Sequence, residues 1–140
     1  MEKNGLNIII VGCGKVGQTL AEHLSDEGNN LTVVDIRADR VNALSERIDI
    51  MGVVGNGASY SILNEAGITD ADIIIAVTGS DELNLLCCTI ASSVSEASAI
   101  ARVRTPDYRE EIGYLQRKLG LAMIINPELE AAREIASILA

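Results

Sequence analysis

Three glycines near the N-terminus have the spacing of a phosphate-binding loop. Gly12, Gly14 and Gly17 form the pattern G-x-G-x-x-G, and the apolar run 7–11 leads directly into it. In such a loop the first glycine makes a tight turn, the second lets the backbone approach a pyrophosphate, and the third lets helix and strand pack closely. The helix that follows supplies N–H groups and the positive end of its dipole to an anion.

An acidic residue follows the second apolar run, at the position where a dinucleotide-binding site contacts the ribose. The apolar run 31–34 ends in Asp35, 18 residues after Gly17. There the dinucleotide-binding fingerprint has an acid that hydrogen-bonds the ribose hydroxyls. Because a carboxylate repels a 2′-phosphate, we expect an adenine nucleotide, NAD(H) or ATP/ADP, and we expect NADP to be disfavoured. The residues do not choose between NAD(H) and ATP/ADP, since both present an adenosine ribose and phosphates to the same loop.

The composition restricts the class of protein. A length of 140 residues predicts a single nucleotide-binding domain over residues 1–140, with an aliphatic core because Phe and Trp are absent. The net charge of −9 and the 2% aromatic content argue against nucleic acid as a partner. No membrane span or targeting segment is readable, so we expect a cytoplasmic protein without direct membrane insertion. Three cysteines, Cys13, Cys87 and Cys88, fit neither a disulfide framework nor a metal site.

Strand-like apolar runs alternate with helical periods along the whole chain. Continuously apolar strands predict a parallel sheet that is covered by helices on both faces. We therefore expect an α/β, Rossmann-like, doubly wound six-stranded sheet of order 3-2-1-4-5-6, with the ligand at the carboxyl ends of the strands. The runs predicted as strands are 7–11, 31–35, 50–54, 73–77, 99–103 and 122–125.

The helices between these strands have recognisable ends and apolar stripes. Gly28 and Gly67 are placed to end the first and third helices, and Ser59 could cap the third. The fifth and sixth helices are predicted to open at Thr105-Pro106 and Asn126-Pro127. For the fourth helix the predicted buried stripe is Leu83, Leu86, Cys87, Ile90 and Val94.

Residues at the carboxyl ends of the strands are the candidates for ligand binding. Arg102 and Arg104 stand at alternate positions of the fifth predicted strand and so point to one face, although a surface salt bridge is the alternative interpretation. Ordinary turns and caps also explain much of 55–59 and 78–81. The candidate cofactor-binding residues are Gly12, Cys13, Gly14, Lys15, Val16, Gly17, Asp35, Ile36, Arg37, Gly55, Asn56, Gly57, Ala76, Val77, Thr78 and Arg102.

Two features look catalytic but have simpler interpretations. Tyr114 and Lys118 form Y-x-x-x-K, the spacing of short-chain dehydrogenases, yet those enzymes use a different glycine pattern and a serine partner. The sole histidine, His23, lies on the first predicted helix beside acidic residues. We interpret Tyr114 and Lys118 as a pair at the rim of a helix and His23 as a solvated or half-buried helix position, and we expect no catalytic residue.

Several runs of this sequence resemble the N-terminal domain of the Trk potassium-uptake regulator family, which is also called the RCK, KTN or TrkA-N domain. The similarity extends in order over essentially the whole chain, so it is more specific than the glycine motif. It rests on 8–17, 20–24, 33–35, 55–59, Ala76-Val77-Thr78, Asp81-Glu82 with Asn84, Arg102-Val103-Arg104, and Asn126-Pro127-Glu128.

The resemblance implies a regulatory, nucleotide-binding domain that controls a potassium uptake system or channel. It implies a homodimer that assembles into a higher ring beneath a membrane potassium transporter or channel subunit. Lys15 and Arg102 would then contact phosphates, and Glu128 matches an acidic position that helps bind a cation in some relatives. Asn56 departs from the family, because many relatives have aspartate there. The chain ends at Ala140, where full-length relatives continue with a further lobe, and this leaves open whether it is a cut chain or a single-domain relative.

Two other functions fit the sequence less well. An NAD-dependent oxidoreductase would need a substrate-binding lobe and a proton-transfer group beside the nicotinamide, and neither is readable in 140 residues. A structural assembly domain with a decayed nucleotide site is disfavoured by the intact glycine loop and Asp35. The broad apolar stripe of the sixth predicted helix, Leu129 to Leu139, predicts a dimer contact there. The identity of the transporter and the direction of regulation stay open.

Overall fold

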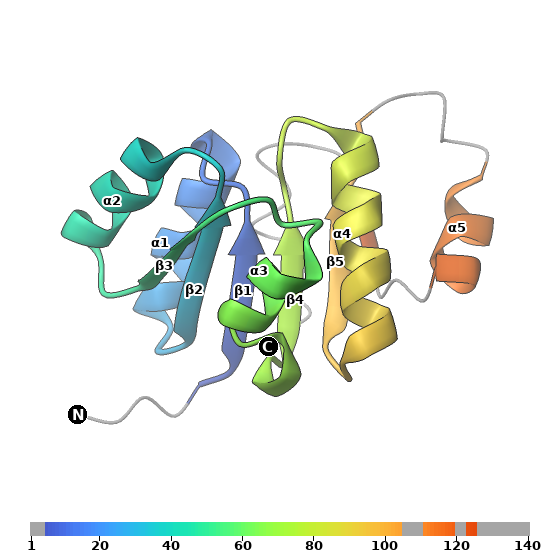
Figure 1. Ribbon diagram of the computed structural model, residues 1–140, viewed down its shortest axis with the longest axis horizontal. Helices are drawn as coiled ribbons and strands as arrows, with labels where there is room; N and C mark the ends of the chain where they lie inside the picture. The colour runs from blue at the N-terminus through green and yellow to red at the C-terminus, as the bar shows by residue number, and fades with distance from the viewer. Residues whose placement is uncertain (1–4, 105–110, 120–122, 126–140) are drawn as a thin grey trace.

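A parallel sheet with helices on both faces forms the fold (Figure 1). The computed structural model describes residues 5–104, 111–119 and 123–125. Its strands are β1 (Asn7–Val11), β2 (Asn30–Asp35), β3 (Met51–Val54), β4 (Ile73–Ala76), β5 (Ser98–Arg102) and β6 (Met123–Ile125). Its helices are α1 (Lys15–Asp26), α2 (Ala38–Arg47), α3 (Tyr60–Glu65), η1 (Ile68–Asp70, a 3-10 helix), α4 (Asp81–Val94) and α5 (Ile112–Leu119).

The strand order confirms the predicted topology. The sheet runs β3-β2-β1-β4-β5-β6, and every pairing between neighbours is parallel. From β1 the chain first adds β2 and β3 on one side of β1, and it later adds β4, β5 and β6 on the other side. The order therefore reverses between β1 and β4, which is where ligands of doubly wound sheets bind.

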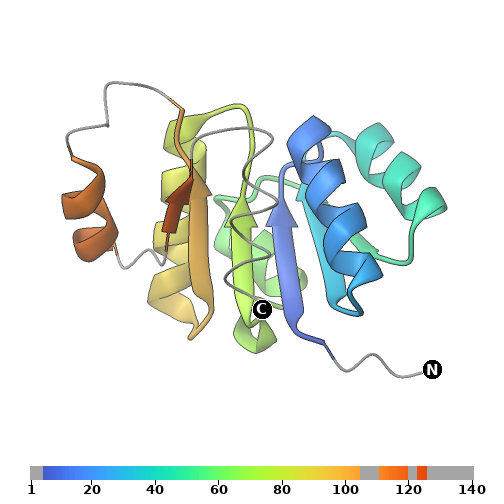
Figure 2. The same ribbon diagram turned by 180° about the vertical axis from the view of Figure 1, so that it is seen from behind.

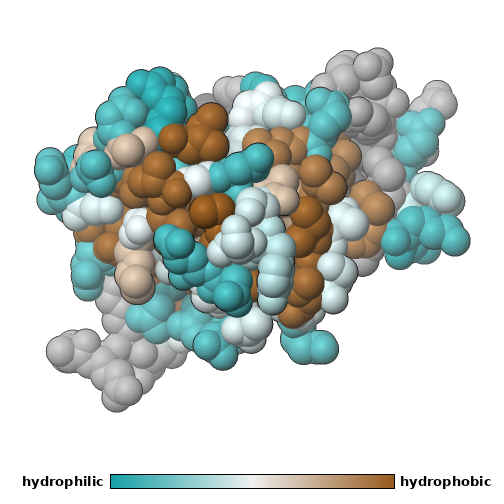
Figure 3. Space-filling model, in the orientation of Figure 1, coloured by the Kyte–Doolittle hydropathy of each residue, from teal (hydrophilic) through white to brown (hydrophobic). Residues whose placement is uncertain are grey.

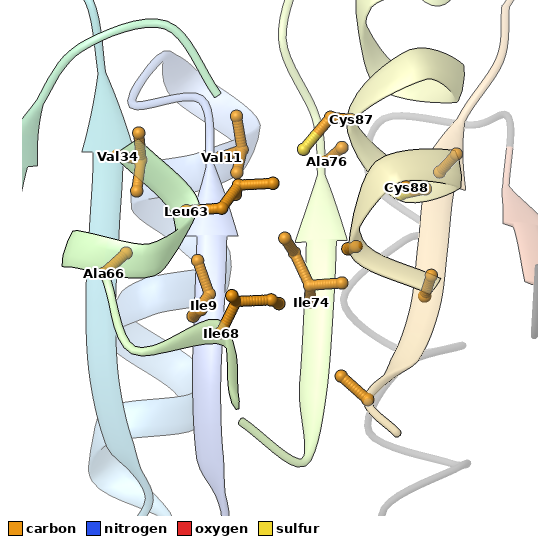
Figure 4. Packing of buried hydrophobic residues seen from close by; sticks show 14 of the residues in the cluster. Ile9, Val11, Val34, Leu63, Ala66, Ile68, Ile74, Ala76, Cys87 and Cys88 are labelled. Carbon is orange, nitrogen blue, oxygen red and sulfur yellow. The ribbon is translucent and has the colours of Figure 1, made fainter. Parts of the chain in front are cut away.

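The central strands β1 and β4 bury both of their faces, which explains their continuously apolar runs, whereas the edge strand β3 buries only Val53. Ile8 and Ile10 of β1 join a core cluster with residues of α1 and α2. Ile9 and Val11, the alternate residues, join a second cluster with residues of α3 and α4 (Figure 4). Figure 2 shows α1 and α2 on the face opposite to α3 and α4.

Helix α4 differs from its predicted packing. Its sheet-facing residues are Asn84, Cys87, Cys88 and Ala91, whereas the expected core residue Leu86 is 52% exposed and Val94 is also exposed. Apolar atoms are accordingly visible at the surface along this helix (Figure 3). The strand residues that face α4 are small, namely Ala76, Ala99 and Ala101. The helix therefore packs close to β4 and β5, and its own small residues face the sheet.

The predicted helix ends are confirmed at two glycines and corrected at one serine. Gly28 and Gly67 follow α1 and α3 with φ of 88° and 89°, a backbone region that glycine adopts without strain. Ser59 occupies the N-cap position of α3, but its side chain makes no capping bond, and its hydroxyl pairs with that of Ser61. Four features of the sequence analysis lie outside the described residues. They are the expected first residues of two helices, Thr105-Pro106 and Asn126-Pro127, the sixth helix, and Glu128. Within the described ranges, no helix combines the length and the apolar composition needed to cross a membrane.

Candidate functional site

A cavity of about 680 Å³ lies at the carboxyl edge of the sheet. It extends across the order reversal, from residues that follow β2 and β3 to residues that end β5. Its volume is within the range of small-molecule sites, roughly 300–1,000 Å³. Its lining residues are Val11, Gly12, Cys13, Gly14, Lys15, Val16, Thr19, Val34, Asp35, Ile36, Arg37, Arg40, Gly55, Gly57, Val77, Thr78, Gly79, Ser80, Leu83, Arg102 and Arg104.

Two glycines of the loop are required by the packing of the protein itself. Gly12 has φ of 114°, and a Cβ there would stand 2.9 Å from backbone atoms of Val77 and Thr78. A Cβ at Gly17 would overlap the carbonyl oxygen of Gly12. The first glycine thus makes the turn and the third allows α1 to approach it, so neither needs a ligand to explain it.

Gly14 differs from its two neighbours, because nothing in the described protein requires a glycine there. Its φ is −81°, and the nearest atom to an added Cβ is Nη1 of Arg40, at 3.7 Å. Gly14 is the N-cap of α1 and gives the first turn no side-chain acceptor. The N–H groups of that turn therefore face the cavity in the arrangement that binds phosphate at helix N-termini.

Asp35 is held in place by the backbone around the loop. Its Oδ2 accepts a hydrogen bond from the N–H of Cys13 at 2.7 Å, and its Oδ1 accepts one from the N–H of Arg37 at 2.8 Å. A carboxylate offers about four lone pairs. Both oxygens therefore keep capacity for a ribose hydroxyl while the two amides fix their orientation.

Ile36 and the β3–α3 turn form the wall of the cavity on the Asp35 side. Ile36 is 71% exposed, which for a large apolar side chain leaves a surface for a flat ring. A Cβ at Gly55 would meet Ile62, and one at Gly57 would meet Val11, so packing accounts for both glycines. The expected contact Asn56 does not line the cavity. Its Oδ1 accepts a hydrogen bond from the N–H of Ala58 at 2.9 Å and so closes the turn.

The opposite wall is the β4–α4 connection, fastened to the end of β5. The Nη2 atom of Arg102 donates to the carbonyl of Thr78 at 2.7 Å, and that of Arg104 donates to the carbonyl of Gly79 at 3.1 Å. The hydroxyl of Ser80 caps α4 by accepting from the N–H of Leu83. Both arginines line the cavity as their alternate positions predict, and both also serve to hold the loop.

The cavity concentrates positive charge in an acidic protein. Among the residues that the structure describes, five Lys and Arg side chains line it, and Asp35 is the one acid in its lining. Arg37 forms an ion pair with Asp39 of α2, with 2.7 Å between Nη2 and Oδ2. A ligand that carries several negative charges suits this surface. The five basic residues are Lys15, Arg37, Arg40, Arg102 and Arg104.

Sequence reasoning missed Arg40 as a lining residue. It stands on the first turn of α2, one residue before the buried Val41. That helical phase places its side chain beside Gly14. The available signal was a basic residue in the first turn of the helix after Asp35, but spacing alone does not show that this turn faces the glycine loop. Thr19, Ser80 and Leu83 were also missed.

The cysteine of the loop is buried, and its thiol packs against the backbone of α2. The Sγ atom of Cys13 contacts the carbonyl oxygen of Arg40 at 3.5 Å. Burial, and then the charge of Asp35, raise the pKa of this thiol above its usual value of 9.0. Cys13 is therefore kept as a thiol, which fits a packing role rather than a nucleophilic one.

Most of the expected binding residues line the cavity, and three do not. Gly17 lies behind the loop, Asn56 closes a turn and Ala76 is fully buried in the sheet. Tyr114 and Lys118 also lie outside it: Nζ of Lys118 is 5.8 Å from the centre of the Tyr114 ring, which is 55% exposed. His23 is exposed on α1. In the described part of the chain, no three acidic, histidine or cysteine side chains gather as a metal site requires.

The chain matches known proteins over nearly its full length. The family model of the TrkA-N domain matches residues 8–127. The chain is 43% identical over 125 residues to the Trk system potassium uptake protein TrkA of Halomonas elongata, covering 88% of this chain and 27% of that protein. It thus spans about a quarter of that relative.

Three solved structures have the same fold. The TrkA-N domain of inner membrane protein ybaL from Escherichia coli has a TM-score of 0.76 and 27% identity, and the alignment covers 99% of this chain and 98% of that one. The GsuK channel bound to NAD has a TM-score of 0.73 and 25% identity, over 87% of this chain and 21% of the channel chain. GsuK bound to ADP has a TM-score of 0.72 and 25% identity, over 88% and 31% of the respective chains.

Proposed function

The chain belongs to the TrkA-N domain family, and from that premise we propose that it is the nucleotide-sensing regulatory domain of a potassium uptake system. An adenine nucleotide binds in the cavity at the carboxyl edge of the sheet, and its binding alters the contacts between subunits. The observation that carries the proposal is the cavity itself, in which an uncapped helix N-terminus, a fixed carboxylate and five basic residues converge.

The class of ligand follows from the groups that line the cavity. The ribose lies against Asp35, the phosphates against Gly14 and the N-terminus of α1, and the adenine against Ile36. Lys15, Arg40 and Arg102 neutralise phosphate charge. The structures of GsuK bound to NAD and to ADP support both adenine nucleotides as candidates. NADP is disfavoured because its 2′-phosphate would meet Asp35.

The partner and the location follow from the named relatives. TrkA is a potassium uptake protein of the Trk system and GsuK is a channel. We accordingly place this domain on the cytoplasmic side of a membrane potassium transporter or channel subunit. There it acts as a homodimer, and in a higher ring assembly where the partner has several subunits.

A panel of nucleotides tests this proposal. Thermal unfolding is measured with AMP, ADP, ATP, NAD, NADH and NADP, because a ligand that binds the folded state raises the unfolding temperature. At least one nucleotide without a 2′-phosphate should raise it, and NADP should raise it less than NAD does. If no adenine nucleotide at millimolar concentration changes the unfolding temperature, the proposal is wrong.

The oxidoreductase interpretation predicts a different result. Absorbance at 340 nm, the band of reduced nicotinamide, should stay constant when NAD is mixed with the protein and small alcohols or hydroxy acids. Tyr114→Phe and Lys118→Ala should leave nucleotide affinity unchanged, because neither residue lines the cavity. Sustained formation of NADH would restore the enzyme interpretation.

A further inference from the structure

A buried asparagine shapes the cavity without lining it. Asn84 lies on α4, its exposed fraction is 0%, and it is absent from the cavity wall. Its Oδ1 accepts hydrogen bonds from the N–H and the hydroxyl of Thr78, at 2.9 Å and 2.6 Å. Its Nδ2 donates to the carbonyl oxygens of Thr78 and Arg102, at 3.2 Å and 2.9 Å.

These four bonds use the whole hydrogen-bonding capacity of the amide. A primary amide has two N–H donors and two acceptor lone pairs. Three of the bonds go to Thr78, the second residue after β4, and one goes to the end of β5. The guanidinium of Arg102 also binds the carbonyl of Thr78, at 2.7 Å. Asn84 therefore fixes the two residues of the cavity wall, Thr78 and Arg102, relative to each other.

The wall held by Asn84 lies on one half of the cavity only. Neighbouring strands are about 4.8 Å apart, so the end of β5 is roughly 14 Å from the end of β2, across β1 and β4. A nucleoside monophosphate that places its ribose on Asp35 and its phosphate on Gly14 is accommodated over β2 and β1. Whatever is attached beyond the 5′-phosphate, further phosphates or a second nucleoside, extends over β4 and β5.

We propose that Asn84 is a positioning residue that makes the site selective for nucleotides extended beyond the 5′-phosphate. This inference rests on the proposed function and deepens it. Asn84 fixes the backbone of Thr78 and of Arg102. The Thr78 carbonyl in turn holds the guanidinium of Arg102 at the cavity wall, beside the extended part of the ligand. The monophosphate portion is bound by the other half of the cavity and is independent of Asn84.

A purely structural role for Asn84 makes a different prediction. Thr78 belongs to a loop that is continuous with β4, and loosening it would lower the stability of the whole sheet. In that case every nucleotide would bind the variant more weakly by the same factor. The ratio of two affinities therefore separates positioning from general support.

The experiment compares AMP with NAD and ATP on wild type and on Asn84→Asp. Aspartate has nearly the same shape and keeps the acceptor for Thr78, but it cannot donate to the two carbonyls. Thr89→Val is the matched control on the same helix, because it removes a partly buried hydroxyl that donates within the helix, to the carbonyl of Leu85. Affinities are measured by calorimetry, and circular dichroism checks that each variant is folded.

The extended nucleotide used for the comparison is NAD or ATP, whichever wild type binds more tightly. For Asn84→Asp we expect its dissociation constant to rise at least about tenfold, the scale of one or two lost hydrogen bonds. That of AMP should stay within about twofold, and Thr89→Val should match wild type for both. If Asn84→Asp does not fold, Asn84→Ala, which buries no charge, replaces it. An equal loss for AMP and the extended nucleotide, or no loss for either, overturns the inference. Failure of wild type to bind any nucleotide would instead contradict the proposed function.

Discussion

Gly14 and Gly17 belong to one sequence motif but have different physical causes. The spacing of the motif predicts both, together with Asp35, and the structure assigns a reason to each. Gly17 is required because a Cβ would overlap the carbonyl of Gly12, whereas a Cβ at Gly14 would meet only Nη1 of Arg40, at an ordinary contact distance of 3.7 Å. Sequence alone cannot separate these reasons, because they depend on which backbone atoms the fold brings near each Cα.

This difference predicts that the same substitution acts mainly on stability at Gly17 and mainly on nucleotide binding at Gly14. Gly17→Ala should destabilise the fold by about 1–3 kcal/mol, the cost of forcing an extra methyl group into a packed site. Gly14→Ala should cost no more than about 1 kcal/mol, the loss of a favourable N-cap residue, but should weaken nucleotide binding because a methyl group enters the phosphate position. Urea unfolding and calorimetric titration measure the two effects. Unchanged nucleotide affinity in a folded Gly14→Ala protein would contradict the placement of the phosphate.

Arg40 shows where residue-level prediction was incomplete. The sequence argument rests on positions that directly follow a strand, whereas Arg40 stands five residues beyond Asp35, on a helix. It reaches the cavity because the first turn of α2 packs beside the glycine loop. That contact depends on the angle at which the helix leaves the strand, and residue spacing does not specify this angle.

At the scale of elements, the apolar runs predicted the strands to within a residue or two and predicted their order. The prediction for α4 was less accurate, because its sequence has two apolar stripes. One contains Leu86, Ile90 and Val94, and the other contains Cys87, Cys88 and Ala91 around Asn84. Hydrophobicity favours the first stripe, but the alanine-rich faces of β4 and β5 accept the smaller one.

Because α4 places two cysteines against the sheet, their chemistry should report on folding. Burial raises the pKa of Cys87 to about 12 and that of Cys88 well above its usual 9.0. The folded state therefore holds these protons more tightly than the unfolded state does. Stability is fully present below pH 9 and should fall as the pH rises above it, since unfolding then releases protons. Urea unfolding between pH 7 and pH 10.5 measures this trend.

The same two thiols give a second readout at constant pH. The thiolate is the reactive form, so at pH 8 a disulfide reagent such as dithiobisnitrobenzoate should react with Cys87 and Cys88 far more slowly in the native protein than in urea. The variants Cys87→Ala and Cys88→Ala identify which thiol each phase belongs to. Equally fast labelling in the native protein would show that α4 does not cover β4 and β5 as described.

At the scale of the whole molecule, the net charge and the charge of the cavity have opposite sign. The chain carries a net charge of −9, yet five basic residues of its described part line one cavity. Composition predicted an acidic protein without a nucleic-acid surface, and the motif predicted an anion site. Their combination could not be read from composition, because it depends on the convergence of the glycine loop, α2 and β5.

The proposed homodimer is tested at the C-terminus, which lies outside the described residues. The sequence there has a broad apolar stripe that includes Ile135 and Leu139. The double variant Ile135→Glu and Leu139→Glu should be monomeric by light scattering while its circular dichroism stays that of a folded protein. A wild type that is already monomeric at tens of micromolar, or a double variant that unfolds, would count against a dimer built through this segment.

The central claim is that a nucleotide binds in this cavity with its ribose on Asp35. The most direct test is calorimetric titration of wild type and Asp35→Ala with AMP and with adenosine 2′,5′-bisphosphate, which differ by the 2′-phosphate alone. Wild type should prefer AMP, and Asp35→Ala should lose about 1.5–3 kcal/mol of AMP binding, the scale of a hydrogen bond to a charged group. The variant should also lose most of the preference, because the repelling charge is gone. Equal binding of both ligands by wild type, together with unchanged AMP affinity in Asp35→Ala, would contradict the account.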